Sequence, residues 1–226
     1  MRNIHHKIPL SAATMLAMLL GSYLYSTSAD AAELTEIRDI SKIMGSIRIS
    51  ADEHVGNLSS INGGIDLARG ARADKIDTVN GSINLDERVV ITLAKTVNGG
   101  IRVANDVTVN GSLLTVNGSI RTNPGTVIED RIRTVNGRIQ LRNTLVGKNV
   151  QTSNGDIVIS DGSTVEGDVV VRGGRTWWRR WFGFDHNPSN ISIDASSSVQ
   201  GDIHLYREVT LEIEEGAEVG EIIRHY

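Results

Sequence analysis

The chain has 226 residues, no cysteine and a formal net charge of −4, with 23 basic and 27 acidic residues. This mildly acidic balance disfavours general nucleic-acid binding, which needs a basic surface. The lack of cysteine excludes disulfides and a lipid-modified cysteine at a processing site. The 23 glycines and the low aromatic content of 4% favour tight turns around thin layers of aliphatic side chains.

The first 31 residues have the layout of a secretory signal peptide. Arg2 and Lys7 precede an apolar run over residues 8–25, and the small residues around Ala31 form a cleavage site. An uncleaved anchor is the alternative, because the apolar run is near the lower length limit for spanning a bilayer. We expect cleavage after Ala31, which leaves residues 32–226 as one exported domain, either periplasmic or at the cell surface.

A motif of the form T-V-N-G recurs after the leader. The Met-Gly and Asn-Gly pairs in this position begin at residues 44, 62, 80, 98, 117, 136 and 154, with steps of 18 or 19. A fixed period of this size indicates a solenoid, in which each period forms one coil and like residues stack about 4.8 Å apart. Antiparallel hairpins, the alternative for short strands joined by Asn-Gly, give no reason for the period. The sequence therefore predicts an all-β, single-stranded parallel β-helix with 18–19 residues per coil.

Aliphatic residues at fixed offsets are expected to form the core, each contributing about 1.5–3 kcal/mol. The column four residues before the Asn position contains Ile40, Leu58, Ile76, Leu113, Ile132 and Val150, with Leu93 one place earlier in its coil. The column one residue before it contains Ile43, Ile61, Val79, Val97, Val116 and Val135. An alternating aliphatic pair follows each glycine, with Arg48, Asp66, Asn84, Arg102 or Gln140 between its members. This alternation predicts a short strand with one buried and one wet face.

The asparagines of the motif are interpreted as a structural turn ladder and not as a ligand site. The ladder residues are Asn62, Asn80, Asn98, Asn117, Asn136 and Asn154. A bend between two sides needs a residue that tolerates positive φ, and Asn and Gly do so most readily. Stacked asparagines can also link their amides from coil to coil.

The C-terminal part keeps the pattern but contains one insertion. Gly167, Gly201 and Gly220 are separated by 34 and 19 residues, so one coil carries extra residues. These lie in an aromatic and basic loop at about 172–190. Its candidate contact residues are Arg175, Trp177, Trp178, Arg179, Arg180, Trp181, Phe182 and Phe184. Because Trp and Arg dominate interface energetics, the loop predicts a contact with an envelope protein, a glycan or a membrane surface; a structural cover over the solenoid is the alternative.

Catalytic and metal-binding motifs are missing from the sequence. The histidines have no metal-ligand spacing, and there is no cysteine to complete a site. Asp156, Asp168 and Asp202 follow turn glycines, but the calcium-binding nonapeptide pattern is absent. We therefore expect a non-enzymatic protein with no cofactor and no metal, and a polysaccharide-binding or polysaccharide-cleaving β-helix is a further alternative.

The stacked TVNGSI, TVNGGI and TVNGRI copies over residues 40–171 resemble a bacterial family of exported β-helical domains described as adhesins. The resemblance implies a structural or adhesive role in the cell envelope and transfers no catalytic or binding residues. The tail at 191–224 is faintly similar to bactofilins, which are polymer-forming β-helical proteins. This second similarity implies end-to-end stacking into a homo-oligomer as the alternative, since coil ends are templates for further coils.

Overall fold

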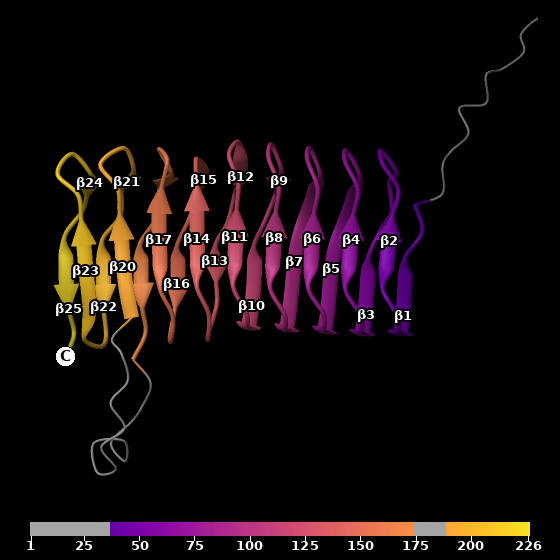
Figure 1. The fold of residues 1–226 in the computed structure, drawn as a ribbon, viewed down its shortest axis with the longest axis horizontal. Coiled ribbons are helices and arrows are strands. Elements are labelled where there is room, and N and C mark those ends of the chain that lie inside the picture. The colour runs from indigo at the N-terminus through magenta and orange to yellow at the C-terminus, as the bar shows by residue number, and fades with distance from the viewer. Residues whose placement is uncertain (1–36, 174–188) are drawn as a thin grey trace, which may run out of the picture. The chain divides into compact units, whose positions relative to one another are not determined.

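The computed structural model describes residues 37–173 and 189–226, which form a rod of stacked coils (Figure 1). All strand pairs in this part of the chain are parallel, and the strands belong to one sheet of nine strands and one of 16. The predicted parallel β-helix is confirmed, with nine coils as counted by the smaller sheet. Within the same residues we find no helix long and apolar enough to span a membrane.

The 9-stranded sheet forms the first side of every coil. Its strands are β2 (Ile47–Ile49), β4 (Ile65–Leu67), β6 (Ile83–Leu85), β8 (Ile101–Val103), β11 (Ile120–Thr122), β14 (Ile139–Arg142), β17 (Ile157–Ser160), β20 (Ser189–Ile193) and β23 (Val209–Ile213).

The larger sheet forms the other two sides and forks at β7, which pairs with both β9 and β10. The second side contains β9 (Thr108–Val109), β12 (Thr126–Ile128), β15 (Thr144–Val146), β18 (Thr164–Val165), β21 (Ser198–Val199) and β24 (Glu218–Val219). The third side contains β1 (Ile40–Met44), β3 (Leu58–Asn62), β5 (Arg72–Asn80), β7 (Val90–Asn98), β10 (Leu113–Asn117), β13 (Ile132–Arg133), β16 (Val150–Thr152), β19 (Val169–Val171), β22 (Ile203–Leu205) and β25 (Ile222–Arg224). Because β5 and β7 are nine residues long, each bends over both of these sides.

The aliphatic pairs after the glycines stack in the core as predicted. Ile65 pairs with Ile47 below it and with Ile83 above it, so like residues lie one coil apart. The same column continues through Ile101 and Ile120, both fully buried. Since strand side chains alternate between faces, the residue between the two aliphatic members points outward.

The column one residue before the asparagines faces solvent, and its predicted burial is wrong. Ile43 is 70% exposed, Ile61 46%, Val79 40% and Val116 36%. On a strand, residues three apart point to opposite faces, so this column cannot share the core with the column four before the asparagine. The other two residues of this column, Val97 and Val135, are half-buried. We call these six residues the aliphatic stripe.

Threonine takes the inward place that was predicted for the stripe. Thr78, Thr96, Thr115 and Thr134 are buried, and each hydroxyl donates to a glycine carbonyl of the preceding coil at 2.8–3.0 Å. A buried hydroxyl is costly unless it is hydrogen-bonded, so the glycine carbonyls make threonine acceptable in the core. In the coil of Asn98, Ala94 fills the core column and Leu93 is half-buried on the outside.

The glycines of the Asn-Gly corner are needed for close approach, not for positive φ as predicted. None of the ladder asparagines has positive φ, and among their glycines only Gly137 does. A Cβ at Gly63 would lie 2.2 Å from the carbonyl oxygen of Gly45, so glycine must stack on glycine here. Left-handed residues lie instead at the corner between the first and second sides, for example Asp106 with φ of 57° and Asp161 with φ of 60°.

The insertion between β19 and β20 leaves the coil register intact. Val169 pairs with Ile203, and Ile157 pairs with Ile191, so in both pairs the partner lies 34 residues on. Asp156 helps to hold the strand after the insertion, since its Oδ1 accepts from the backbone N–H of Asn190 at 3.1 Å. The Arg138 guanidinium donates to the same carboxylate and lowers the pKa of Asp156, as does the Asn190 amide.

Both terminal coils carry a cation in the inward threonine column of the third side. Lys42 is paired with Ser60, which is buried, and Arg224 is paired with Leu205, which is also buried. Both cations are exposed to solvent because no further coil of the described chain covers them. A charged side chain at an inward position of an edge strand disfavours pairing with another strand.

Candidate functional site

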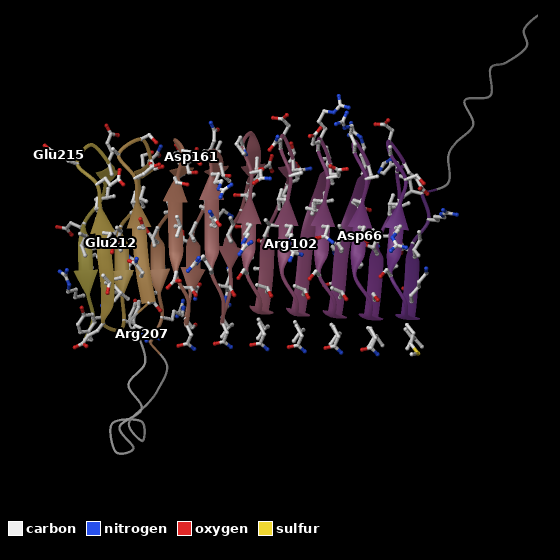
Figure 2. All side chains as sticks on the ribbon, in the orientation of Figure 1. Asp66, Arg102, Asp161, Arg207, Glu212 and Glu215 are labelled. Atoms are coloured by element: carbon white, nitrogen blue, oxygen red, sulfur yellow. The ribbon has the colours of Figure 1, made fainter. Side chains whose placement is uncertain are left out.

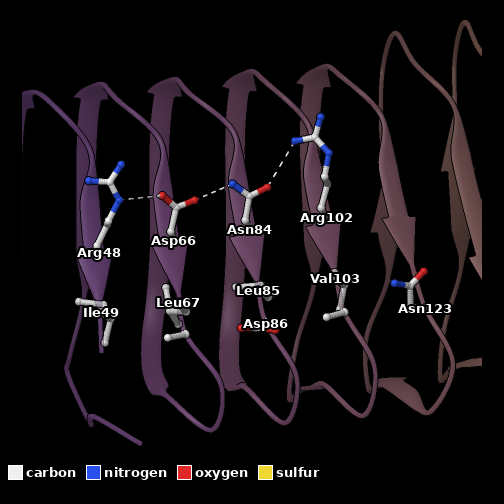
Figure 3. Close-up of a pocket in the computed structure, with 12 residues that line it drawn as sticks. Arg48, Ile49, Asp66, Leu67, Asn84, Leu85, Asp86, Arg102, Val103 and Asn123 are labelled. Carbon is white, nitrogen blue, oxygen red and sulfur yellow. Dashed lines mark hydrogen bonds and ion pairs between the residues drawn. The ribbon is translucent and has the colours of Figure 1, made fainter. Parts of the chain in front are cut away.

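A shallow groove with a volume of about 500 Å³ lies on the first side. It runs along the rod axis over the first five coils, from Arg48 to Asn123 (Figure 3). Between its walls lie Ile49, Leu67, Leu85 and Val103, whose side chains point into the core, so the strands themselves form the floor. One wall is a polar row, and the other consists of Ala68, Asp86, Ala104 and Asn123 at the corner.

The polar row contains one side chain from each of four successive coils, from β2 to β8. Arg48 Nε lies 3.7 Å from Asp66 Oδ2, and Asn84 donates to Asp66 Oδ1 at 2.6 Å. Arg102 then donates to Asn84 Oδ1 at 3.3 Å. Parallel pairing in register places these residues directly over one another. The contacts hold the row at a fixed spacing of about 4.8 Å per coil.

The row is positively charged at both of its ends. Arg102 is followed in the next coil by Arg121, its register partner, and a smaller hollow of about 190 Å³ lies between them. Arg48, Arg102 and Arg121 are exposed, so their guanidinium groups keep donors free for a ligand. Figure 2 shows Asp66 and Arg102 on the middle of this face, away from the rod's edges.

The predicted ladder asparagines lie at the corner between the third and first sides. Each Nδ2 donates to the Oδ1 of the asparagine one coil before, at 2.8–2.9 Å in all five links from Asn62 to Asn154. At the far end, Arg207 Nη1 donates to Asn154 Oδ1 at 2.7 Å and to the Ser153 carbonyl at 3.2 Å. Figure 2 places Arg207 at the edge of the rod where this row ends.

The carboxylates that follow the turn glycines link successive coils. Asp168 Oδ1 accepts from the backbone N–H of Asp202 at 3.1 Å, and Asp202 Oδ1 accepts from that of Glu221 at 2.9 Å. His204 and His225 are also neighbours, with Nδ1 and Nε2 3.2 Å apart. In residues 37–173 and 189–226 no three His, Asp or Glu side chains gather as a metal site would require.

The aromatic and basic residues predicted to make contacts lie outside the described residues, since Arg175 to Phe184 fall within 174–188. In the sequence these residues stand between β19 and β20. Arg175, Trp177, Trp178, Arg179, Arg180, Trp181, Phe182 and Phe184 stay a prediction from composition.

The sequence analysis did not predict the groove, because no single motif within one repeat indicates it. Arg48, Asp66, Asn84 and Arg102 were assigned to a wet strand face, and that assignment is correct. The groove also depends on the next outward column, in which Ala68 and Ala104 are small and alternate with Asp86 and Asn123. The small residues two places after the polar row were the available signal.

The fold and surface together define a parallel β-helix with ladder-like faces and a shallow polar groove on one of them. A scan against protein-family models found no match, and neither a search of curated proteins nor one of solved structures found any.

Proposed function

We propose that the chain is an exported, non-enzymatic binding module of the bacterial cell envelope, and that its groove binds an extended acidic polymer such as an acidic glycan. The observation that carries this proposal is the row from Arg48 to Arg102, whose members contact one another along one wall of the groove. A row with a constant spacing matches a ligand that itself repeats along a line.

The chemistry of the row favours an acidic ligand. Arg48 and Arg102 in the row balance Asp66 and, in the facing wall, Asp86, and Arg121 of the adjoining hollow adds a third cation. Arginine is suited to carboxylates because its planar fork donates two parallel hydrogen bonds. The parallel strands fix the spacing of the donors, and the contacts of Arg48 and Arg102 within the row reduce the cost of ordering these side chains on binding.

The leader-like residues 1–31 support export, and the resemblance to adhesin-type domains supports a structural or adhesive role. The Trp and Arg residues of 175–184 are proposed as a second contact, to a partner or surface. A rigid rod with contacts at separate places is suited to holding envelope components at a set distance.

Binding of an oligogalacturonate to the full chain, measured by calorimetry, tests the groove. We expect Arg102→Gln to weaken binding about tenfold, because a charged hydrogen bond contributes about 1.5–3 kcal/mol. Arg72→Gln is the matched control, since Arg72 is an exposed arginine at the start of β5 and does not line the groove. We also expect the affinity to fall between about 50 and 200 mM salt as the charges are screened.

Equal binding of a neutral cello-oligosaccharide, or equal loss in both arginine variants, would contradict the groove proposal. The same incubations can be examined for shortened oligosaccharides. Turnover that depends on the groove residues would replace the binding proposal with the polysaccharide-cleaving alternative.

End-to-end assembly is the alternative function, and the two ends of the rod give arguments for and against it. The last coil leaves Val209, Leu211 and Ile213 only partly buried, so an apolar end is available. Continuing the register would also place Glu212 in the column of Arg48 from the next copy. However, it would bring Arg224 to within about 4.8 Å of the next copy's Lys42 in an inward column.

Because two inward cations repel in a low-dielectric core, we expect the native chain not to form filaments at any concentration tested by light scattering. Lys42→Ser with Arg224→Leu restores the residue types of the adjacent coils and is expected to permit filaments. The control is Lys75→Ser with Arg72→Leu, which removes two exposed cations from the middle of the rod. Filaments of the native chain would show that the cations do not protect the ends.

A further inference from the structure

The aliphatic stripe is an exposed apolar surface on the third side that neither the groove nor the predicted loop uses. It spans six successive coils, which is a length of about 24 Å at 4.8 Å per coil. Single exposed aliphatic residues are ordinary, but a contiguous row of them marks a contact surface. We propose that the stripe is the interface of a side-by-side homodimer in which two rods pack antiparallel.

The spacing of the stripe favours a second copy of the same chain as the occupant. Its side chains repeat at the coil rise, and another β-helix presents side chains at the same repeat. Two such faces can pack as two sheets do, about 10 Å apart, with the side chains of one copy interdigitating with those of the other. A ligand without this repeat would contact only part of the stripe.

The shape of the stripe favours the antiparallel arrangement. Its N-terminal end carries the larger and more exposed residues, with Ile43 at 70% and Ile61 at 46%. Its C-terminal end has a hollow of about 240 Å³ lined by Val116 and Val135, among others. A two-fold axis between the third and fourth coils places Ile43 against Val135, and Ile61 against Val116 of the other copy. The protruding end thereby fills the hollow of the other copy.

The charges beside the stripe lead to the same arrangement. Two residues before each stripe residue lies a second outward column, in which Asp77 is paired with Lys95 one coil later. The two-fold axis brings Asp77 of one copy opposite Lys95 of the other. A parallel dimer has its two-fold axis along the stripe, which places this column on opposite sides of the stripe in the two copies, so it makes no such charge pairs. Opposite charges across an interface set its orientation, while like charges oppose it.

The interface is small, because it consists of one aliphatic row and its neighbours. Such interfaces belong to the weak class, well below the standard buried area of about 1,600 Å². We therefore expect a monomer–dimer equilibrium with Kd on the order of 10–100 μM. Analytical sedimentation of the full chain measures this Kd. Val79→Asp, at the centre of the stripe, is expected to raise Kd by more than tenfold. Leu145→Asp is the matched control, because Leu145 is a 37% exposed aliphatic residue on the second side.

Charge reversal tests the orientation. Asp77→Lys and Lys95→Asp are each expected to raise Kd about tenfold, and the double variant is expected to restore it. Melting by circular dichroism shows whether each variant is folded. Full dimerisation of every reversal variant would overturn the antiparallel arrangement.

Cross-linking gives a readout independent of affinity, since the chain has no cysteine of its own. Ile43→Cys mixed with Val135→Cys is expected to form a disulfide dimer, because the two residues face each other. Ile43→Cys alone is expected not to, because its two copies would lie about 24 Å apart, far beyond disulfide reach. Cross-linking of Ile43→Cys alone would show a parallel dimer. A strict monomer at millimolar concentration would overturn the proposal. So would a monomeric native chain that binds lipid vesicles and loses this binding in Val79→Asp.

Discussion

Gly63→Ala is expected to lower the free energy of unfolding by about 3 kcal/mol, which corresponds to a fall in Tm of roughly 6–12 °C for a domain of this size. The added Cβ would lie 2.2 Å from the carbonyl oxygen of Gly45 and 2.5 Å from its carbonyl carbon. Both atoms belong to the backbone, so no side chain can move aside to relieve the clash. The coils must separate or tilt locally, and the parallel hydrogen bonds beside the corner weaken with them.

Gly64→Ala is the matched control for this prediction. Its Cβ would lie 3.1 Å from the carbonyl oxygen of Ser82, a tight contact that a shift of a few tenths of an ångström relieves, and the adjacent coils carry Ser46 and Ser82 at the same position. We expect a Tm within a few degrees of the native value. Equal losses in the two variants, measured by thermal unfolding, would mean that chain flexibility and not the close approach explains the glycine.

Thr96→Val is expected to lower the free energy of unfolding by about 1–3 kcal/mol. The Thr96 hydroxyl donates to the Gly81 carbonyl at 2.8 Å, and Gly99 of the next coil covers that carbonyl closely. Valine has almost the same shape, so packing is preserved while the buried acceptor loses its donor. Urea unfolding monitored by circular dichroism measures the difference.

Thr152→Val in the same inward column is the control. The Thr152 hydroxyl is fully buried and has no hydrogen-bond partner among the described residues. Its register partner in the next coil is Val171, so valine already occurs at this position of the column. We expect unchanged or raised stability. A loss equal to that of Thr96→Val would show that the glycine carbonyl is not what makes threonine favourable.

The coil and its register were predictable because the period of 18–19 depends on which residues must stack, and not on local preference. Ile47, Ile65 and Ile83 were aligned correctly by number alone. The insertion was also found by arithmetic, since a spacing of 34 exceeds one coil. Repeats are informative because a core of identical layers tolerates few alternative alignments.

The sequence prediction places the valine of the T-V-N-G motif in the core because valine is apolar. It neglects that residues an odd number apart on a strand point to opposite faces. Val79 is more apolar than Thr78, yet Ile76 occupies the core face of that strand, and of the two residues only Thr78 shares that face. What makes threonine acceptable there is the carbonyl of Gly63 in the neighbouring coil. That acceptor belongs to the stacked arrangement and cannot be seen in one repeat.

The candidate surfaces were less predictable than the fold. The polar residues from Arg48 to Arg102 were placed on the wet face, but the groove depends on how two outward columns differ in size. The aliphatic stripe was not predicted either, because the sequence prediction placed Val79 and its column in the core. Both surfaces are properties of columns that cross several coils, so motifs within one repeat do not reveal them.

The asparagine ladder also has an electrical consequence. Every amide donates toward the N-terminal coil, so from Asn62 to Asn154 the amide dipoles point the same way and their effects add. The row therefore ends in partial negative charge at the Asn154 oxygen, as a helix does at its C-terminus. The guanidinium of Arg207 lies against that oxygen and neutralises it. One cation thus compensates a polarisation that accumulates over six coils of the rod.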